Sequence, residues 1–465
     1  MKDMTQGSEA RLIVLFALPM LIGNVFQQLY IVVDSLVVGR YLGKQALAAI
    51  GACFPIVFLL IALAMGLTMG ASILISQYYG AKDFVRAKKA IDTTYISLFV
   101  VGVLLSITGP FLSQTILIQM HTPAEILPLA RIFIDIFFYG LTFMFGYNTV
   151  SSVLRAVGDS KTPTIYLILS TVVNSILVVV FVTVFHWGIA GSGVATLIAQ
   201  GASFLGLILH VNRKENALLH FKITRMIFDW ESFQKIVKLG LPAGVQQLSV
   251  ALGMMAIIRF VNNFGTDVIA GFTAASRLDA FALMPSMNLS IAVSTFVGQN
   301  IGANKMDRVR QGLRAGLWLG VGFSILISAL ILLAGRNLLG LFTHDPAVIA
   351  AGLRYFHIAA WFYIVFSVMF VLSGLFRGAG NTLVPMILTI LSMFVVRIPV
   401  ARVLSRRMGP DGIWWSFVIG WGVGLILCVG YYYTGRWKRF SLITAASSSS
   451  SARSPKNPRF ERDPQ

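Results

Sequence analysis

Long apolar runs alternate with short polar segments along almost the whole chain, from Ile13 to Tyr433. Each run is long enough for the roughly 20 residues that a helix needs to cross a bilayer. The runs are continuous, which excludes the short alternating strands of a membrane barrel. We therefore predict an all-α integral membrane protein that lies in a lipid bilayer. Its twelve or so transmembrane helices are expected to begin near residues 12, 46, 91, 126, 163, 189, 239, 268, 315, 350, 383 and 412.

The pattern repeats within the chain. The stretch "QYYGAKDFVRAKKA" (77–90) is similar to "QNIGANKMDRVRQG" (299–312), an offset of 222 residues. The same offset takes Arg155 to Arg377 and Pro163 to Pro385, and chance matches would not keep one register over such a length. Each half then holds six spans and enters the membrane in the same orientation. This predicts two six-helix lobes related by a parallel pseudo-twofold axis, a transporter architecture with its substrate site between the lobes.

The repeat and the polar segments predict the domain boundaries. Residues 1–215 form an N-lobe with spans 1 to 6, and residues 239–438 form a C-lobe with spans 7 to 12. The charged segment 216–238 is expected to be a cytoplasmic loop between the lobes. Residues 439–465 are rich in Ser, Pro and charge and are predicted to be a disordered cytoplasmic tail.

Composition supports a membrane protein, because 57% of the residues are hydrophobic and only 12% are charged, against about a quarter in soluble domains. The formal charge of +19 raises the alternative of nucleic-acid binding. Of the 37 Lys and Arg residues, 26 fall in the termini and alternate loops, six lie within or at the ends of spans, and five (Arg40, Lys44, Arg336, Arg406 and Arg407) fall in the opposite loops. This bias indicates that both termini are cytoplasmic in a multi-pass plasma-membrane protein, here a bacterial inner membrane, without a nucleic-acid partner.

Enzyme chemistry finds little support in the sequence. Cys53 and Cys428 lie in apolar spans near opposite ends of the chain, so neither a disulfide framework nor a metal site is implied. No clustered His, Asp or Ser/Lys dyad occurs at membrane depth, and no Walker motif is present. We expect no catalytic residues, no metal and no cofactor, and no direct use of ATP.

One acidic residue stands out in the first span, "FQQLYIVVDSLVVGRYLG" (26–43). A carboxylate at Asp34 costs at least about 2.5–3.5 kcal/mol in a bilayer, so an intramembrane acid indicates function. Tyr30 lies one turn earlier on the same helix face. The repeat places Ala256 opposite Asp34, so the fold does not require the acid. The alternative is a structural acid that stays hydrogen-bonded to Asn or Tyr.

Four motifs carry a family resemblance over about residues 10–435. They are "LYIVVDSLVVGRYLG" in the first span, "LRAVGDSKTP" after the fourth, "FVGQNIGA" after the eighth and "FRGAGNTLVP" after the tenth. Together they resemble the prokaryotic multidrug and toxic compound extrusion (MATE) family. The resemblance implies a cation-coupled antiporter that exports organic, cationic and amphipathic compounds by alternating access, with H⁺ or Na⁺ as the coupling ion.

The resemblance also implies roles for particular residues. Family members have an N-lobe cavity whose residues match Asp34, Tyr30, Asn148, Asn174 and Thr196. Pro19 matches a proline that can bend the first helix. Close relatives carry a second acid where this chain has Val178, and another branch carries acids where it has Val250 and Phe366.

The C-lobe has two further candidates. Asp279 falls where many relatives carry an acid in the eighth span, and we expect it in a C-lobe cavity. Arg397 occupies about the place that Asn174 holds in the first half, as a counter-ion to Asp279 or as an anchor.

Other functions are less well supported by these features. A lipid-linked saccharide flippase of the same wider superfamily is the nearest alternative, but twelve spans and a lone first-span acid disfavour it. A channel is disfavoured by the twofold repeat, and an integral membrane enzyme by the absence of clustered catalytic residues. We expect a monomer, and the sequence leaves the substrate and the choice between H⁺ and Na⁺ open.

Overall fold

The computed structural model describes residues 3–213, 218–221, 223–440 and 442. Within these residues the chain is helical and has no strand, and twelve helical segments are long and apolar enough to cross a membrane. The predicted fold class and the number of spans are thus confirmed. Most of the predicted tail, residues 216, 217 and 222 of the predicted inter-lobe loop, and residues 214 and 215 at the end of the predicted N-lobe lie outside the described residues.

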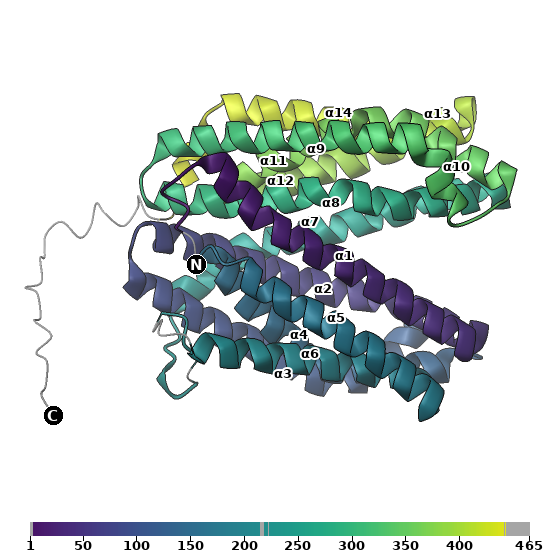
Figure 1. Ribbon diagram of the computed structural model, residues 1–465, viewed down its shortest axis with the longest axis horizontal. Coiled ribbons are helices and arrows are strands. Elements are labelled where there is room, and N and C mark those ends of the chain that lie inside the picture. Colours follow the sequence, from purple (N-terminus) through teal and green to yellow (C-terminus); the bar gives the residue numbers. More distant parts are fainter. Residues whose placement is uncertain (1–2, 214–217, 222, 441, 443–465) are drawn as a thin grey trace, which may run out of the picture.

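The first six spans form the N-lobe (Figure 1). They are α1 (Glu9–Tyr41), α2 (Gly43–Gly80), α3 (Phe84–Gln119), α4 (Leu127–Ala156), α5 (Lys161–Val179) with a π-helical turn (Val180–Val184), and α6 (Gly188–Arg213).

The other six spans form the C-lobe. They are α7 (Trp230–Val261) with a 3₁₀ turn (Asn262–Phe264), α8 (Thr266–Gly302), α9 (Met306–Gly340), α10 (Pro346–Ala359) continued by α11 (Tyr363–Gly378), α12 (Leu383–Ile390) continued through a π-helical segment (Leu391–Arg397) into α13 (Ile398–Met408), and α14 (Pro410–Tyr433).

The seventh helix begins earlier than the apolar run does. Asp229 caps α7, because its Oδ2 accepts a hydrogen bond from the Ser232 backbone N–H at 2.8 Å. Glu231 adds a second acid in the first turn, where a negative charge interacts favourably with the positive end of the helix dipole. The first turns of α7 therefore occupy a segment that hydropathy assigned to the inter-lobe loop.

The repeat is visible in the backbone. The offset of 222 residues takes α2 onto α8, α3 onto α9 and α6 onto α14, with bounds that agree within a residue or two. It also pairs turn residues in the left-handed region, Lys82 (φ 59°) with Asn304 (φ 56°) and Gly158 (φ 87°) with Gly380 (φ 93°). Contacts between the lobes follow the same symmetry, since α1 contacts α8 and α2 contacts α7.

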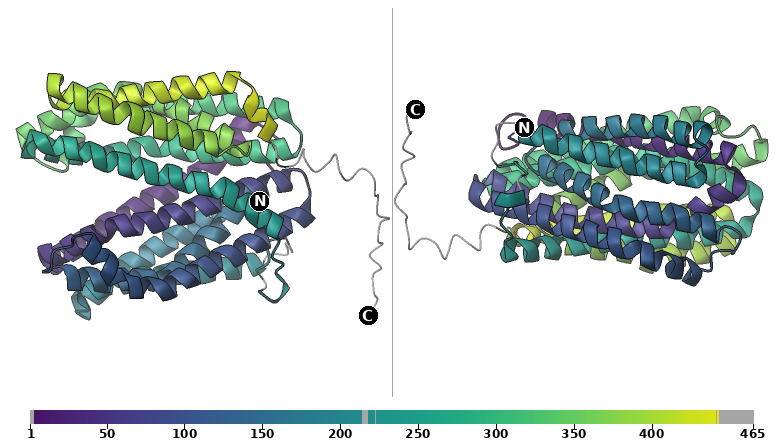
Figure 2. Two further views of the ribbon diagram at one scale, coloured as in Figure 1. Left: turned by 180° about the vertical axis from the view of Figure 1, so that it is seen from behind. Right: turned by 90° about the horizontal axis from the view of Figure 1, so that it is seen from below.

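The lobes approach each other at one end, which we call the sealed end, and diverge toward the other, the far end (Figure 2). Near the sealed end the backbones of α2 and α7 are in close contact. A Cβ added to Gly66 would lie 2.6 Å from the Cα of Gly244, and one added to Gly70 would lie 2.6 Å from the backbone nitrogen of Gly240. Glycines allow this approach, as is common between membrane helices.

Two glutamines cross the sealed end in a reciprocal way. Gln77 Nε2 donates to the Gly378 carbonyl at 2.9 Å, and Gln299 Nε2 donates to the Ala156 carbonyl at 2.8 Å. The repeat relates both the donors and the acceptors. Each glutamine Oε1 also accepts a backbone N–H at 3.0 Å, from Leu442 at Gln77 and from Met4 at Gln299. The seal therefore joins both lobes and the segments that flank the first and last spans.

Helix α1 crosses from one lobe to the other (Figure 1). Its first half packs against the C-lobe, where Ile13 and Phe16 belong to a buried cluster with Phe296 and Phe376. Its second half packs against α5 and α6, where Val37 is part of the cluster around Val178. A change in the angle between the lobes must therefore act on α1.

Candidate functional site

A polar cluster lies in the N-lobe between α1, α5 and α6. Asp34 is half-buried on α1, and its Oδ1 accepts a hydrogen bond from Ser192 Oγ of α6 at 2.7 Å. The hydroxyls of Tyr30 and Thr196 are 3.0 Å apart. Asn174 Nδ2 of α5 donates to Thr196 Oγ1 at 3.1 Å. Four of the five residues assigned to the N-lobe site thus lie on three helices that α6 links together.

Thr196 holds the centre of this network. Its hydroxyl is within 3.1 Å of the Ser192 carbonyl, one turn earlier on α6. A hydroxyl has one hydrogen and two acceptor sites. When that hydrogen goes to Ser192, Thr196 can accept from both Tyr30 and Asn174, so a single side chain satisfies groups from two other helices.

An oxygen in this cluster has no partner. Asn174 is 3% exposed, and its Oδ1 is buried without a hydrogen-bond donor in the described part of the chain. The cluster offers one carboxylate, one amide oxygen and three hydroxyls, and oxygen ligands are those that hard cations prefer. No neighbouring cation pairs with Asp34 among the described residues. The arrangement can therefore accept a proton or a small cation.

Two residues differ from the sequence-based picture. Asn148 on α4 donates to the Met144 carbonyl of its own helix at 2.8 Å, and within the described residues no hydrogen bond joins it to the cluster. Ser192, the direct partner of Asp34, was not selected from the sequence. Its signal was available, because Ser192 and Thr196 are one turn apart and share a helix face.

The positions where the family resemblance implies further acids are apolar here. Val178 is fully buried against Val37 and Phe181. Phe366 is buried and stacks on Phe370 with ring centroids 4.2 Å apart. Position 178 therefore supplies no second carboxylate to accompany Asp34.

The C-lobe holds a separate buried carboxylate. Asp279 on α8 is 7% exposed, and its two oxygens accept hydrogen bonds from Tyr355 at 2.7 Å and from Tyr363. Neither tyrosine was selected from the sequence, since the span containing both is apolar and gives no periodic polar signal. The two phenols, from α10 and α11, thus each donate a hydrogen bond to the carboxylate.

Arg397 lies near this carboxylate without a direct ion pair to it among the described residues. Its guanidinium carbon is 3.3 Å from the centroid of the Phe417 ring, a cation–π contact. Its Nη1 contacts Met393 Sδ at 3.7 Å, while Nε and Nη2 have no partner within the described chain. The aromatic face holds the cation, and electrostatic attraction to Asp279 acts over a longer distance.

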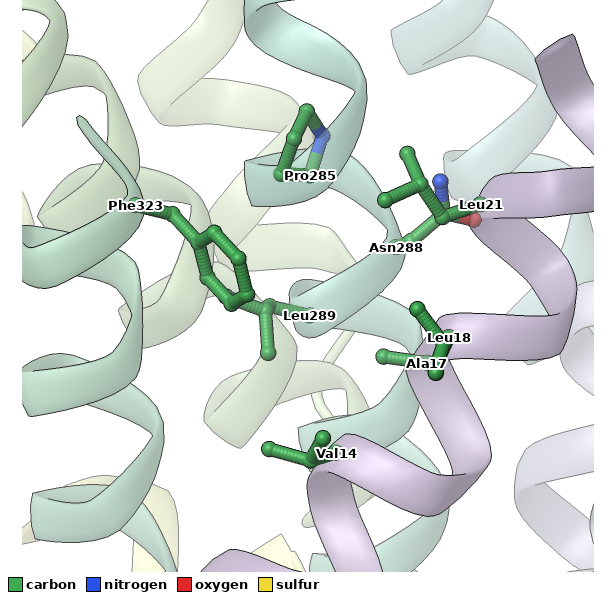
Figure 3. A pocket seen from close by; sticks show the side chains of 8 residues that line it. All are labelled: Val14, Ala17, Leu18, Leu21, Pro285, Asn288, Leu289 and Phe323. Carbon is green, nitrogen blue, oxygen red and sulfur yellow. The ribbon is translucent and has the colours of Figure 1, made fainter. Parts of the chain in front are cut away.

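Pro19 lies in the half of α1 that contacts the C-lobe. Proline has no backbone N–H, so the helix lacks one internal hydrogen bond at that point. A small cavity adjoins this segment (Figure 3), and its lining consists of Val14, Ala17, Leu18 and Leu21 of α1 with Pro285, Asn288, Leu289 and Phe323 of the C-lobe. One turn beyond, Asn24 Nδ2 donates to Asn288 Oδ1 at 3.1 Å. Packing between α1 and the C-lobe is thus incomplete beside the proline.

Comparison with known proteins gives consistent matches. The MatE family model matches residues 19–180 and again residues 242–403, one match in each lobe. "Probable multidrug resistance protein YpnP" of Bacillus subtilis is 36% identical over 449 residues, covering 95% of this chain and 99% of that protein. "Probable multidrug resistance protein YoeA" of the same organism is 35% identical over 426 residues, covering 90% of this chain and 92% of that protein.

Solved structures share the fold. One, described as the outward-facing conformation of a multidrug resistance MATE family transporter, has a TM-score of 0.88 at 23% identity, covering 94% of this chain and 99% of that chain. A transporter of the MOP superfamily from Pyrococcus furiosus has a TM-score of 0.87 at 23% identity, covering 94% of this chain and 98% of that chain.

Proposed function

The chain belongs to the multidrug and toxic compound extrusion family, and from this premise we propose that it is a cation-coupled antiporter that exports organic, cationic and amphipathic compounds. It is a transporter rather than an enzyme, and members of the family need no cofactor. Its relatives are named multidrug resistance and multidrug export proteins, which does not favour the flippase alternative. We further propose that it acts as a monomer in the bacterial plasma membrane.

The observation that carries the proposal is the setting of Asp34. This carboxylate is half-buried on a membrane-spanning helix, and it accepts a hydrogen bond from the neutral hydroxyl of Ser192 at 2.7 Å. An ionised acid in such surroundings is costly, and binding H⁺ or Na⁺ removes that cost. Entry of the cation on one side and its release on the other would then alternate the charge of the cluster.

The seal supports alternating access between two states of the lobes. The reciprocal bonds of Gln77 and Gln299 hold one end closed while the helices diverge at the other. Opening the sealed end breaks both bonds together, because the repeat makes them equivalent. A change in the bend of α1 at Pro19 is the proposed link between Asp34 and the seal, since α1 packs on both lobes.

The basic residues support an orientation. Lys82 and Arg86 lie at the sealed end of the N-lobe, and Lys305 and Arg308 lie at the sealed end of the C-lobe. By the positive-inside rule this end faces the cytoplasm, together with both termini. The state described here is then closed to the cytoplasm.

Transport in proteoliposomes tests this proposal. Efflux of a fluorescent organic cation is measured with a pH gradient and a Na⁺ gradient imposed separately. The wild-type protein should respond to one of them, and Asp34→Asn should abolish gradient-driven transport while keeping the fold. Asp267→Asn, the same substitution at an exposed residue, is the control. Wild-type transport by Asp34→Asn would show that the coupling acid lies elsewhere, with Asp279 the next candidate.

A further inference from the structure

A polar pocket lies at the far end of the C-lobe, where α7 and α13 end side by side. Its lining residues are Phe260, Asn263, Phe264, Arg402, Ser405 and Arg406. Both arginines are exposed, and α7 and α13 contact each other along their ends. The pocket thus combines two guanidinium groups, an amide, a hydroxyl and two aromatic rings.

The arginines of this pocket are not held in ion pairs within the part of the chain that the structure describes. Within the described residues, neither Arg402 nor Arg406 forms an ion pair with a carboxylate, and neither do the adjacent Arg259 and Arg407. The far end is otherwise poor in basic residues, as the distribution of Lys and Arg along the chain shows. A cluster of four arginines there departs from the charge bias that sets the topology.

Exposed apolar side chains precede the pocket on both helical segments. On α7, Leu252 and Met255 are more than half exposed and lie on the helix face that ends at Asn263. In the π-helical segment before α13, Val395 is 61% exposed and precedes Arg402 by seven residues. On each segment, exposed apolar side chains thus precede the polar residues that line the pocket.

We propose that this pocket binds the phosphate headgroup of an anionic phospholipid, with the acyl chains along the exposed faces of α7 and the α12–α13 segment. Arginine matches phosphate oxygens through paired N–H donors, and the Asn263 amide and Ser405 hydroxyl can add further hydrogen bonds. A soluble anion would use the polar groups alone, whereas the exposed apolar side chains before the pocket fit a ligand with tails. This lipid site lies in the C-lobe and is independent of the transport function proposed above.

Lipid binding to the purified full-length protein in neutral detergent tests the site. Phosphatidylglycerol, phosphatidylcholine and inorganic phosphate are titrated separately, and binding is followed by native mass spectrometry and by the shift in melting temperature. Phosphatidylglycerol should bind and stabilise the wild-type protein, and the other two should not. Arg402→Gln/Arg406→Gln should bind phosphatidylglycerol roughly 30-fold more weakly, because each arginine near a membrane surface contributes to anionic lipid affinity.

The matched control is Arg40→Gln/Arg336→Gln, which removes two exposed charges at the far end, outside the pocket. This variant should keep the affinity of the wild-type protein. An equal loss of phosphatidylglycerol affinity in both double variants would indicate general electrostatic attraction and overturn the proposal. Equal stabilisation by phosphatidylcholine would also overturn it, and an equal effect of inorganic phosphate would assign the pocket to a soluble anion. If the double variant of the pocket unfolds, Ser405→Ala should still weaken phosphatidylglycerol binding. Wild-type affinity in Ser405→Ala would then count against the site.

Discussion

Gln77 and Gln299 occupy equivalent positions in the two halves of the chain, and each donates a hydrogen bond to a backbone carbonyl of the opposite lobe, at 2.9 Å and 2.8 Å. Both side chains are fully buried. The accepting residues, Gly378 and Ala156, are also related by the repeat. The same glutamine-to-carbonyl hydrogen bond therefore occurs twice at the sealed end, once from each lobe.

Removing this pair should weaken the seal. Each buried hydrogen bond contributes about 1 kcal/mol, so Gln77→Ala/Gln299→Ala should shift the population toward the state open at the sealed end by tenfold or more. Spin labels at Lys82 and Asn304, which are exposed and related by the repeat, report the separation of the lobes. The double variant should give longer distances than the wild-type protein.

The control for this measurement is Gln311→Ala, an exposed glutamine on α9. It should leave the distance distribution unchanged. Unchanged distances in the double variant would mean that the α2–α7 contact alone closes this end.

Thr196 should be the most sensitive hydroxyl of the N-lobe cluster. Thr196→Val keeps the shape but removes contacts to Tyr30, Asn174 and the Ser192 carbonyl. We expect a loss of the order of 1–2 kcal/mol in unfolding free energy and a large loss of transport. Thr196→Ser, which keeps the hydroxyl, should retain both, as measured by melting temperature and by efflux in proteoliposomes.

Asn148→Leu provides the comparison for that network, because Asn148 bonds to its own helix and, among the described residues, has no hydrogen bond to the cluster. It should reduce transport less than Asn174→Leu does. The reverse order would show that the cluster extends to α4 during the transport cycle.

Asp279 should act on charged substrates. If it faces substrate in the C-lobe, Asp279→Asn will weaken export of organic cations more than export of neutral compounds of similar size. Tyr355→Phe removes one donor to the same carboxylate and leaves its charge, so it separates hydrogen bonding from electrostatics. Equal effects of Asp279→Asn on both substrate types would assign this acid a structural role.

Asp229 gives the start of α7 a dependence on pH. Hydrogen bonds from the Ser232 hydroxyl and backbone N–H lower the pKa of Asp229 from its ordinary value. A lowered folded-state pKa means that the stabilisation is present above the unfolded-state pKa of about 3.9 and is lost as pH falls through the folded-state pKa. Stability from this cap should therefore disappear in acid, below about pH 4.

Asp229→Asn isolates this effect, since asparagine caps helices about as well as aspartate but does not titrate. Melting temperatures of the two proteins should be similar at neutral pH, and the wild-type protein should become the less stable of the two in acid. Asp229→Ala should lose about 1 kcal/mol at neutral pH. A constant difference between wild type and Asp229→Asn at every pH would show that the cap does not titrate with folding.

The sequence by itself determined the twelve spans, the two-lobe repeat and the intramembrane acid at Asp34. These features depend on local properties, because the bilayer thickness sets the length of each apolar run and a charge in such a run is costly wherever it lies. The register of the repeat also places Gln77 and Gln299 at equivalent positions. What the repeat could not show was that the two residues bond across the lobes.

The tertiary structure alone decided which polar groups meet. Hydropathy treated Ser192, Asn148, Tyr355 and Tyr363 alike, as polar or aromatic residues within apolar runs. Ser192 reaches Asp34 and the two tyrosines reach Asp279, whereas Asn148 turns back to its own helix. The physical reason is that a hydrogen bond requires a separation near 3 Å between atoms on different helices. Helix packing sets that separation, and residues far apart along the chain determine how the helices pack.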